Sequence, residues 1–379
     1  MGEYSKALSF YEKSLGIYEI THLSNHPDVA ASYSNTGDVY KDMGEYYKAL
    51  SFYEKALEIY EKALPPNHPS LAASYSNMGL VYNDMGEHSK ALSLYEKSLE
   101  IYEITLPSNH PLLATSYGNI GDVYDDMREY SKAFSFYKKS LEIKQRTLPS
   151  NHNSLATSYN NLGRVYSNMG EYSKALSFYE KALEIYGKTL PPNPPLLATS
   201  YNNIGFVYSN MGEYSKAFSF YEKALGMWQN TLPSNHPSLA TSYNNIGLVY
   251  SNMGEYSKAI LFYEKSLEIK QKTLPSNHPS LATSYNNIGS VYDDMGEYSK
   301  AISCYEKALG IYKITLPPNH PLLATSYNNM GLVYSNMGEY SKALSFYERA
   351  LDIEQHALSP THPSIKNLRE SIETVKNKL

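Results

Sequence analysis

Apolar and small residues recur along this chain at the spacing of an amphipathic helix, and glycine and proline interrupt the pattern at regular intervals. In the stretch that begins at Leu239, they fall at positions 243, 246, 247 and 250, the i, i+3, i+4, i+7 spacing of one helical face. Gly254 predicts the end of this first helix. A second apolar stripe follows Glu255 and reaches Leu274, after which Pro275 cannot continue a helix. The pattern predicts a pair of helices.

The pair is repeated with a constant period of 42 residues, without insertion or deletion. The period is marked by the methionine that precedes Gly-Glu-Tyr or a close variant of it, at Met1, Met43, Met85, Met127, Met169, Met211, Met253, Met295 and Met337. A fixed register of this kind predicts one supersecondary unit stacked many times. The chain is therefore predicted to be an all-α solenoid.

The two ends depart from the repeat. Residues 1–22 are predicted to be a second helix without its first helix, residues 23–357 to be eight full repeats, and residues 358–379 to be a capping helix. The apolar residues of the first segment, such as Phe10 and Leu15, lack a partner in this pattern. We therefore expect self-association through the N-terminal helix. We also expect removal of the cap to promote association.

Composition and charge exclude several classes of partner. The net charge is -5 and the pI is about 6.1, which offers no positive field for nucleic acid or for an anionic membrane. Apolar runs are too short to span a bilayer, and no signal pattern opens the chain. Cys304 is the only cysteine, so no disulfide can form within the chain. We expect a cytoplasmic protein that binds neither nucleic acid nor membranes.

The repeat resembles the tetratricopeptide repeat. The resemblance is carried by Tyr-x-x-Ile-Gly-x-x-Tyr from Tyr243, followed by Ala259 and Tyr263. The 42-residue length and the Asn-His-Pro-x-Leu-Ala link resemble the kinesin light chain and nephrocystin subfamily, although tyrosine stands where the family has its signature tryptophan. The resemblance implies a right-handed superhelical solenoid of antiparallel helix pairs, with a concave groove lined by the first helix of each pair.

A second face of the first helix carries a regular row of asparagines. In tetratricopeptide proteins this face lines the groove, and matching asparagines hold the backbone of a bound peptide, which the resemblance implies here. A primary amide can both donate and accept hydrogen bonds. The alternative is a solvated residue copied by duplication. The predicted peptide-binding residues are Asn77, Asn119, Asn161, Asn203, Asn245, Asn287 and Asn329.

One column on the same face varies between copies whose surroundings barely change: Asp38, Leu80, Asp122, Arg164, Phe206, Leu248, Ser290 and Leu332. Variation confined to a ligand-facing position predicts specificity, and drift at an exposed position is the alternative. We select Arg164, Phe206, Leu248 and Leu332 as specificity residues. The order of Arg164, Phe206 and Leu248 predicts a ligand with one acidic group followed by apolar anchors, whereas strongly acidic tails would be repelled by the many aspartates of this face.

Residue patterns typical of catalysis or of metal binding are missing from the sequence. There is no glycine-rich phosphate loop, no cysteine pair and no His-Glu-x-x-His motif. One histidine per repeat precedes a proline in most copies, and it lacks the converging ligands that a metal needs. These histidines are predicted to cap helices. We expect no enzyme activity, no cofactor and no metal.

The sequence favours a protein-interaction scaffold whose groove holds an extended or short helical peptide. The resemblance suggests a kinesin light chain-like cargo adaptor, but the heptad coiled coil that joins such chains to a motor is absent. The alternative is the regulatory or sensor arm of a larger enzyme or signalling protein, which the unpaired helix in residues 1–22 favours. A structural spacer without a ligand is the third hypothesis.

Overall fold

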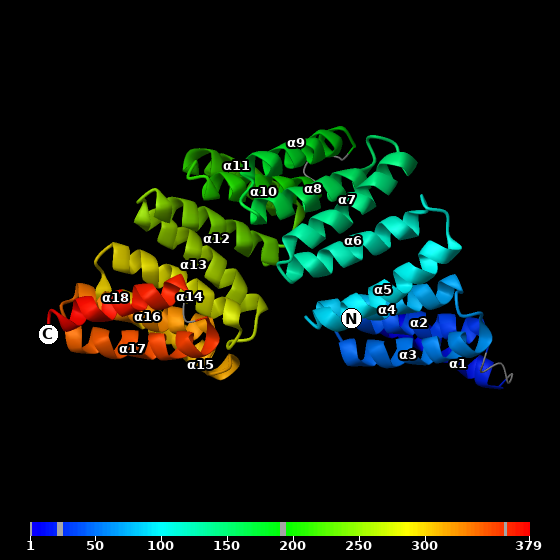
Figure 1. The fold of residues 1–379 in the computed structure, drawn as a ribbon, viewed down its shortest axis with the longest axis horizontal. Coiled ribbons are helices and arrows are strands. Elements are labelled where there is room, and N and C mark those ends of the chain that lie inside the picture. The colour runs from blue at the N-terminus through cyan, green and yellow to red at the C-terminus, as the bar shows by residue number, and fades with distance from the viewer. Residues whose placement is uncertain (1, 21–25, 190–194, 360–361) are drawn as a thin grey trace. The chain divides into compact units, whose positions relative to one another are not determined.

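The computed structural model describes residues 2–20, 26–189, 195–359 and 362–379, and within these ranges every regular element is an α-helix (Figure 1). This confirms the predicted all-α fold of repeated helix pairs. The helices are α1 (Gly2–Ile20), α2 (Pro27–Asp42), α3 (Tyr46–Ala63), α4 (Pro69–Asp84), α5 (His88–Thr105), α6 (Pro111–Asp126), α7 (Tyr130–Thr147), α8 (Asn153–Asn168), α9 (Tyr172–Thr189), α10 (Pro195–Asn210), α11 (Tyr214–Thr231), α12 (Pro237–Asn252), α13 (Tyr256–Thr273), α14 (Pro279–Asp294), α15 (Tyr298–Thr315), α16 (Pro321–Asn336), α17 (Tyr340–Ala357) and α18 (Pro363–Lys376).

The helices group into two compact units. Residues 1–190 hold α1 to α9, and residues 191–379 hold α10 to α18. Within each unit, the even-numbered first helix of a pair packs most extensively on the odd-numbered second helix that follows it. Inside a unit, each second helix also packs on the first helix of the next pair, so that a pair mainly touches its sequence neighbours in that unit. The boundary expected between residues 22 and 23 lies outside the described residues.

Each pair is held together by a tyrosine that fills the space left by a glycine. In the pair of α12 and α13, a Cβ atom added to Gly247 would lie 2.8 Å from the Tyr263 ring. The ring is 3% exposed, and Ala259 beside it is fully buried. Because a side chain larger than hydrogen at position 247 would collide with the ring, the glycine allows the two helices to approach closely. The same contact recurs in all eight pairs and helps to explain the tyrosine-rich composition.

The repeated histidines cap the first helices, as predicted. In every described copy the ring Nδ1 accepts a hydrogen bond from the backbone N–H two residues later, at 3.1 to 3.3 Å. This satisfies one of the amide groups that a helix N-terminus leaves unpaired. The capping residues are His26, His68, His110, His152, His236, His278, His320 and His362. Pro194, which interrupts the column, lies outside the described residues.

The turn between the two helices of a pair requires a left-handed backbone. Glycine meets this requirement in seven of the pairs, with φ between 74° and 77°. In the turn between α6 and α7, Arg128 takes the same conformation at φ 60°. A side chain at such a φ is strained, so this turn is less favourable than its glycine counterparts.

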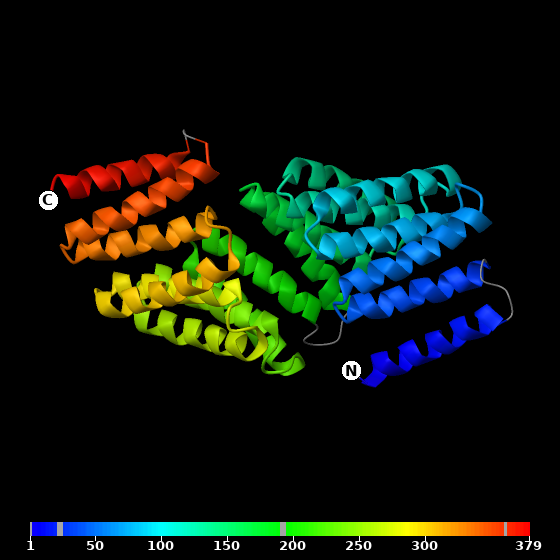
Figure 2. The same ribbon diagram turned by 90° about the horizontal axis from the view of Figure 1, so that it is seen from below.

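The two terminal helices, α1 and α18, lie at the ends marked N and C in Figure 2, and they bury their apolar residues to different extents. On α18, the side chains of Ile365, Leu368, Ile372 and Val375 are at most 9% exposed, and the last three belong to the same core as α17. On α1, Phe10 is 70% exposed. The C-terminal helix therefore covers the last repeat, whereas the N-terminal helix presents an aromatic ring to solvent.

Two further features bear on function. No helix in the described ranges is long and apolar enough to cross a membrane. Nor do the described side chains contain a group of three or more histidines, cysteines or carboxylates that could hold a metal ion.

Candidate peptide-binding face

The first helix of each pair has two faces with different environments. On α12, Ile246 is 1% exposed and packs in the core, whereas Leu248 is 43% exposed. Asn245 lies on the exposed side and is half-buried. This division follows from the helical period, which places residues 245 and 248 on one side and residue 246 on another. We call the surface that carries the row of predicted asparagines and the variable column the asparagine face.

In the second unit, two side-chain amides of the asparagine face donate hydrogen bonds to an asparagine of the preceding repeat. The Asn245 Nδ2 donates to Asn202 Oδ1 of the preceding first helix at 3.2 Å. One repeat later, the Asn287 Nδ2 donates to Asn244 Oδ1 at 3.0 Å. These hydrogen bonds use one amide hydrogen of Asn245 and one of Asn287, and they fix the orientation of both side chains. The oxygen and the second hydrogen of Asn245 and Asn287 make no hydrogen bond to a described residue.

The other predicted asparagines occupy comparable positions. Asn119 lines a cavity of about 320 Å³ in the first unit, whose wall also includes Leu80, Asp84, Asp122 and Arg164. The remaining four are half-buried on their helices: Asn77, Asn161, Asn203 and Asn329. A ligand-binding role for this row remains a prediction. The hydrogen bonds of Asn245 and Asn287 show that two members of the row also connect neighbouring repeats.

Three specificity residues in the second unit are exposed apolar side chains. Phe206 and Leu248 are each 43% exposed, at the same register of α10 and α12, and these two helices contact each other. Leu332 on α16 is 46% exposed. It lines a cavity of about 360 Å³ whose opposite wall is formed by residues of α18, including Asn367 and Thr374. The C-terminal helix therefore bounds the asparagine face at Leu332.

Arg164, in the first unit, is paired within the chain. Its Nη1 lies 2.8 Å from Asp125 Oδ2 in an ion pair, its Nη2 lies 3.7 Å from Asp122 Oδ1, and it donates to the Tyr137 hydroxyl at 3.1 Å. The Tyr137 hydroxyl itself donates to Asp122 Oδ1 at 2.5 Å. The Arg164 guanidinium, which the sequence predicted to pair with an acidic ligand, is thus already paired with two carboxylates of the chain.

The burial of Asp125 explains why this pairing matters. Its side chain is only 2% exposed. Burial raises the pKa of the Asp125 carboxyl, and this rise is opposed by the Arg164 charge and by a hydrogen bond from Asn168. A carboxylate out of water is costly unless it is paired, so the Arg164 charge stabilises the ionised form of Asp125 against the effect of burial.

The sequence alone did not predict the hydrogen bonds between asparagines of neighbouring repeats, nor the ion pairs of Arg164 with Asp122 and Asp125. A signal was present for each, because the 42-residue register places Arg164 one repeat after Asp122, and Asp125 lies one helical turn from Asp122. Similarly, Asn202 and Asn245 are one repeat and one residue apart. Pairing across repeats can be predicted when positions are compared at the period rather than along one helix.

These features define an α-helical repeat protein whose first helices expose one polar and variable face. A tetratricopeptide repeat model matches residues 1–62, 28–104, 70–146, 112–188, 196–272, 262–314 and 280–356. The chain therefore belongs to the tetratricopeptide repeat family. Proteins of this fold are typically non-catalytic, and the repeats make the chain a protein-interaction scaffold. A search of curated proteins gives no match.

Three solved structures illustrate the similarity of fold. A putative kinesin light chain from Podosopora anserina with nearly identical TPR-like repeats is 26% identical, with a TM-score of 0.49 over 54% of this chain and 97% of that one. The apo form of RapI is 17% identical, with a TM-score of 0.58 over 78% and 99%. A Rap protein complexed with Competence and Sporulation Factor is 14% identical, with a TM-score of 0.58 over 93% and 98%. The two Rap structures support the fold alone.

Proposed function

We propose that this chain binds a segment of a partner protein, extended or in a short helix, on the asparagine face of its second unit. The observation that carries the proposal is the pair formed by Phe206 and Leu248, two exposed apolar side chains at one register of contacting helices. Isolated exposed apolar residues are common on protein surfaces. Two in adjacent repeats, flanked by amides that the cross-repeat bonds hold in place, offer both apolar anchoring and backbone recognition.

The chemistry of this surface defines the ligand. The anchors Phe206 and Leu248 favour a ligand with two apolar or aromatic side chains, and amides such as Asn203, Asn245 and Asn287 favour an uncharged backbone. Because Arg164 is neutralised by Asp122 and Asp125, we place less weight on an acidic group in the ligand than the sequence alone suggested. A role as a kinesin light chain-like cargo adaptor is one version of this function.

A peptide library displayed on phage and selected on the whole chain tests the proposal. We expect Phe206→Ala to weaken a selected peptide at least roughly tenfold, because a buried anchor side chain typically contributes about 2 kcal/mol. Asn203→Ala should weaken it by a smaller factor. Since Phe206 is 43% exposed, circular dichroism should show an unchanged fold.

Leu261→Ala is the matched control, because this leucine is 49% exposed but lies on α13, the second helix of its pair. Its affinity should equal that of the unmodified chain. Selected peptides that bind the Phe206→Ala and Asn203→Ala variants undiminished would show that the asparagine face is not the site. The alternative, a regulatory arm of a larger enzyme, predicts instead that the face binds a domain encoded in the same reading frame.

A further inference from the structure

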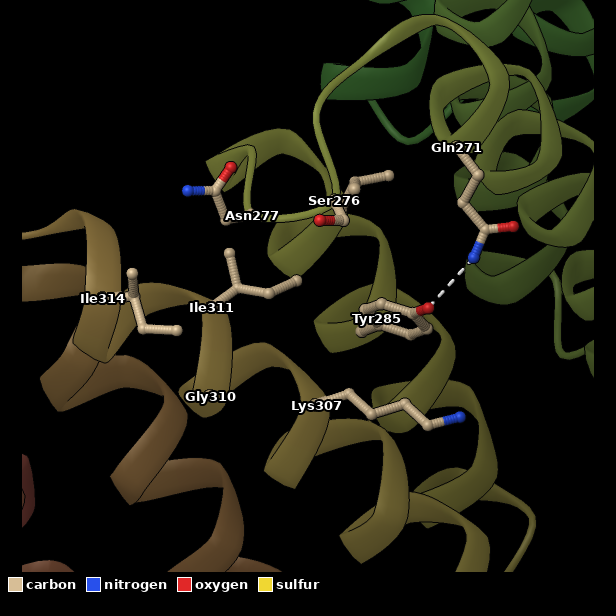
Figure 3. Close-up of a pocket in the computed structure, with 9 residues that line it drawn as sticks. Gln271, Ser276, Asn277, Tyr285, Lys307, Gly310, Ile311 and Ile314 are labelled. Carbon is tan, nitrogen blue, oxygen red and sulfur yellow. Dashed lines mark hydrogen bonds between the residues drawn. The ribbon is translucent and has the colours of Figure 1, made fainter.

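The second unit contains an apolar pocket on the opposite side of the repeat from the asparagine face. It has a volume of about 660 Å³ and lies between the loop after α13, the first helix α14 and the second helix α15 (Figure 3). Leu281 and Tyr285 contribute from α14, and at 100° per residue they project from the side opposite to Asn287 and Ser290. A ligand bound in this pocket would therefore not touch the peptide-binding face proposed above.

Apolar side chains form most of the pocket, and one charge lines it. Leu281, Ile311 and Ile314 provide the apolar surface, and Ile314 is 75% exposed. Lys307 is the only charged lining residue, and its Nζ lies 5.4 Å from the centre of the Tyr285 ring. Among the described residues, Lys307 makes no ion pair.

Neutral polar groups surround the apolar surface. Figure 3 shows the Gln271 amide donating to the Tyr285 hydroxyl, a bond of 3.0 Å that holds both side chains in place. Ser276 and Asn277 lie along the loop side of the pocket, and Ile311 points toward them. The pocket thus presents apolar surface, one cation and a few neutral hydrogen-bonding groups, the composition of a small-molecule site.

The same place three repeats earlier shows what opens this pocket. There the equivalent lining residues leave a cavity of only about 230 Å³, and two of them differ. Glu184 stands in the place of Gly310 and Lys188 in the place of Ile314, and these two form an ion pair of 2.7 Å. In α15 both residues of that ion pair are replaced, and the cavity at the same place is larger.

Packing does not require the glycine in α15. A Cβ atom added to Gly310 would meet nothing within 4 Å, and glycine is a poor helix former. An exposed isoleucine at position 314 likewise gives the isolated chain no buried surface. A ligand that covers Gly310 and Ile314 would explain why two residues that do not favour the isolated chain lie together in this pocket.

We infer that this pocket binds a small amphiphilic carboxylate: a free molecule with an aromatic or aliphatic body and one carboxylate group. The body would lie on Leu281, Ile311 and Ile314, and the carboxylate would pair with Lys307. The volume favours a whole molecule over one inserted side chain, because a cavity of about 150 Å³ already accepts a group the size of benzene. The absence of a carboxylate among the lining residues favours an anion.

Methyl NMR on the isoleucine-labelled full chain, with 4-phenylbutyrate as the probe, tests the inference. We expect saturable shifts at the methyl groups of Ile311 and Ile314, and weaker binding of 4-phenylbutanol, which lacks the charge. Lys307→Gln should weaken phenylbutyrate binding by about fivefold, as expected for a solvent-accessible ion pair. The double substitution Gly310→Glu and Ile314→Lys, which copies α9, should weaken binding by at least about tenfold.

The reciprocal change provides a gain-of-function control. Glu184→Gly with Lys188→Ile should create a second phenylbutyrate site in α9, with shifts at Ile185. Both double variants use residues that the chain already tolerates at the same register, so circular dichroism should be unchanged. The Phe206→Ala variant should bind phenylbutyrate normally, which separates this inference from the proposed peptide-binding function.

Three results would overturn the inference. The first is the absence of saturable binding to the unmodified chain. The second is binding that survives the double substitution in α15. The third is a combination of two observations: the unmodified chain does not bind phenylbutyrate, and the Gly310→Glu, Ile314→Lys variant loses a protein that the unmodified chain binds. This result would make the pocket a protein-docking surface.

Discussion

One register of the asparagine face carries different side chains in two regions that are three repeats apart in the sequence. In the first unit, Asp122, Asp125 and Arg164 form a charged group in which each charge is paired. The same positions in the second unit are neutral: Leu248, Ser251 and Ser290. The helices that carry them have equivalent lengths and caps. A repeat of constant backbone can therefore hold either a group of ion-paired charges or exposed apolar surface.

The residue at this register has a different consequence in each unit. The charged group in the first unit satisfies itself and contributes to the stability of that unit. The exposed Leu248 of the second unit makes no such contribution, and it is available to a ligand. We therefore expect substitutions at this register to change stability in the first unit and binding in the second.

The largest expected effect follows from removing the cation of the charged group. Arg164→Leu would leave Asp125, which is 2% exposed, without its partner. Loss of one partner of a fully buried pair costs about 3–5 kcal/mol, and because Arg164 is itself 41% exposed we expect about 2 kcal/mol. Ser290→Leu, at the same register of the second unit, removes a hydrogen bond to Tyr305 but leaves no buried charge unpaired, so it should cost only about 1 kcal/mol.

Urea unfolding with two probes measures this difference. Trp228, the only tryptophan, lies in α11 and reports on the second unit, whereas circular dichroism reports on all helices. Arg164→Leu should lower the circular dichroism midpoint more than the tryptophan midpoint. Equal shifts of both midpoints would show that the effect is not confined to the first unit.

The pH dependence of the same variant checks the cause. Burial already raises the pKa of the Asp125 carboxyl, and loss of Arg164 should raise it further. For an acid whose folded pKa is raised, stability increases as pH falls from above that pKa toward the unfolded value. The cost of Arg164→Leu should therefore be larger at neutral pH than under mildly acidic conditions. A cost independent of pH would mean that lost packing, rather than the charge of Asp125, causes it.

The next effect concerns the two terminal helices. Phe10 on α1 is 70% exposed, whereas the equivalent Phe52 on α3 stacks on Tyr40 with 5.3 Å between ring centres. We therefore expect the 379-residue chain to self-associate weakly through α1, and Phe10→Glu to weaken the association about tenfold. Sedimentation velocity over a concentration series measures this. Ile104→Glu, at a comparably exposed residue of α5, is the control, and equal effects of the two variants would reject α1 as the contact.

A smaller effect is expected at the turn between paired helices. Arg128 has a φ of 60°, and the residue three repeats later is Gly254 at 76°. Arg128→Gly should stabilise the chain by about 0.5–1 kcal/mol, since relief of left-handed strain exceeds the entropy that glycine adds to the unfolded chain. Gly254→Arg should destabilise it by a similar amount. Thermal unfolding that moves in the same direction for both variants would contradict the strain argument.

The fold was predictable because local signals agree in every copy. The helix caps at residues such as His236, the glycine turn at Gly254 and the close contact of Gly247 with Tyr263 all follow from residue type and spacing. Repetition strengthened the prediction of a helix pair, since each copy of the repeat predicts the same unit. The family match to the same repeats confirms it.

The candidate site was less predictable, because its properties depend on side chains from different repeats. The sequence shows Arg164 as an available cation, and only the structure shows that Asp125 lies 2.8 Å away. The pocket beside α15 was likewise hidden, since Gly310 and Ile314 look unremarkable until the ion pair of Glu184 and Lys188 is seen at the same place. Whether a polar side chain is already paired depends on its distance to side chains of the neighbouring repeats, which the sequence does not give.

The smallest expected effect uses two lysines to test whether the two regions are equivalent. Lys144 and Lys270 occupy the same register of α7 and α13, and each donates to a serine, at 2.9 Å and 2.8 Å. Burial lowers the pKa of both ammonium groups, but the charge of Asp122 opposes this effect at Lys144. At Lys270 the position of Asp122 is taken by Leu248. We therefore expect Asp122→Leu to lower the pKa of Lys144, and Leu248→Asp to raise that of Lys270.

Titration of the lysine side chains by NMR measures both pKa changes directly. Stability should follow with a definite sign, because a base whose folded pKa is lowered is destabilising at pH values below that pKa and ceases to be so as pH rises toward its unfolded value. Leu248→Asp should therefore reduce the gain in stability that the chain shows on going from neutral to alkaline pH. If Leu248→Asp leaves the pKa of Lys270 unchanged while Asp122→Leu shifts that of Lys144, the two registers are not electrostatically equivalent. The difference between the regions would then extend beyond the side chains of the asparagine face to the packing of the helices beneath it.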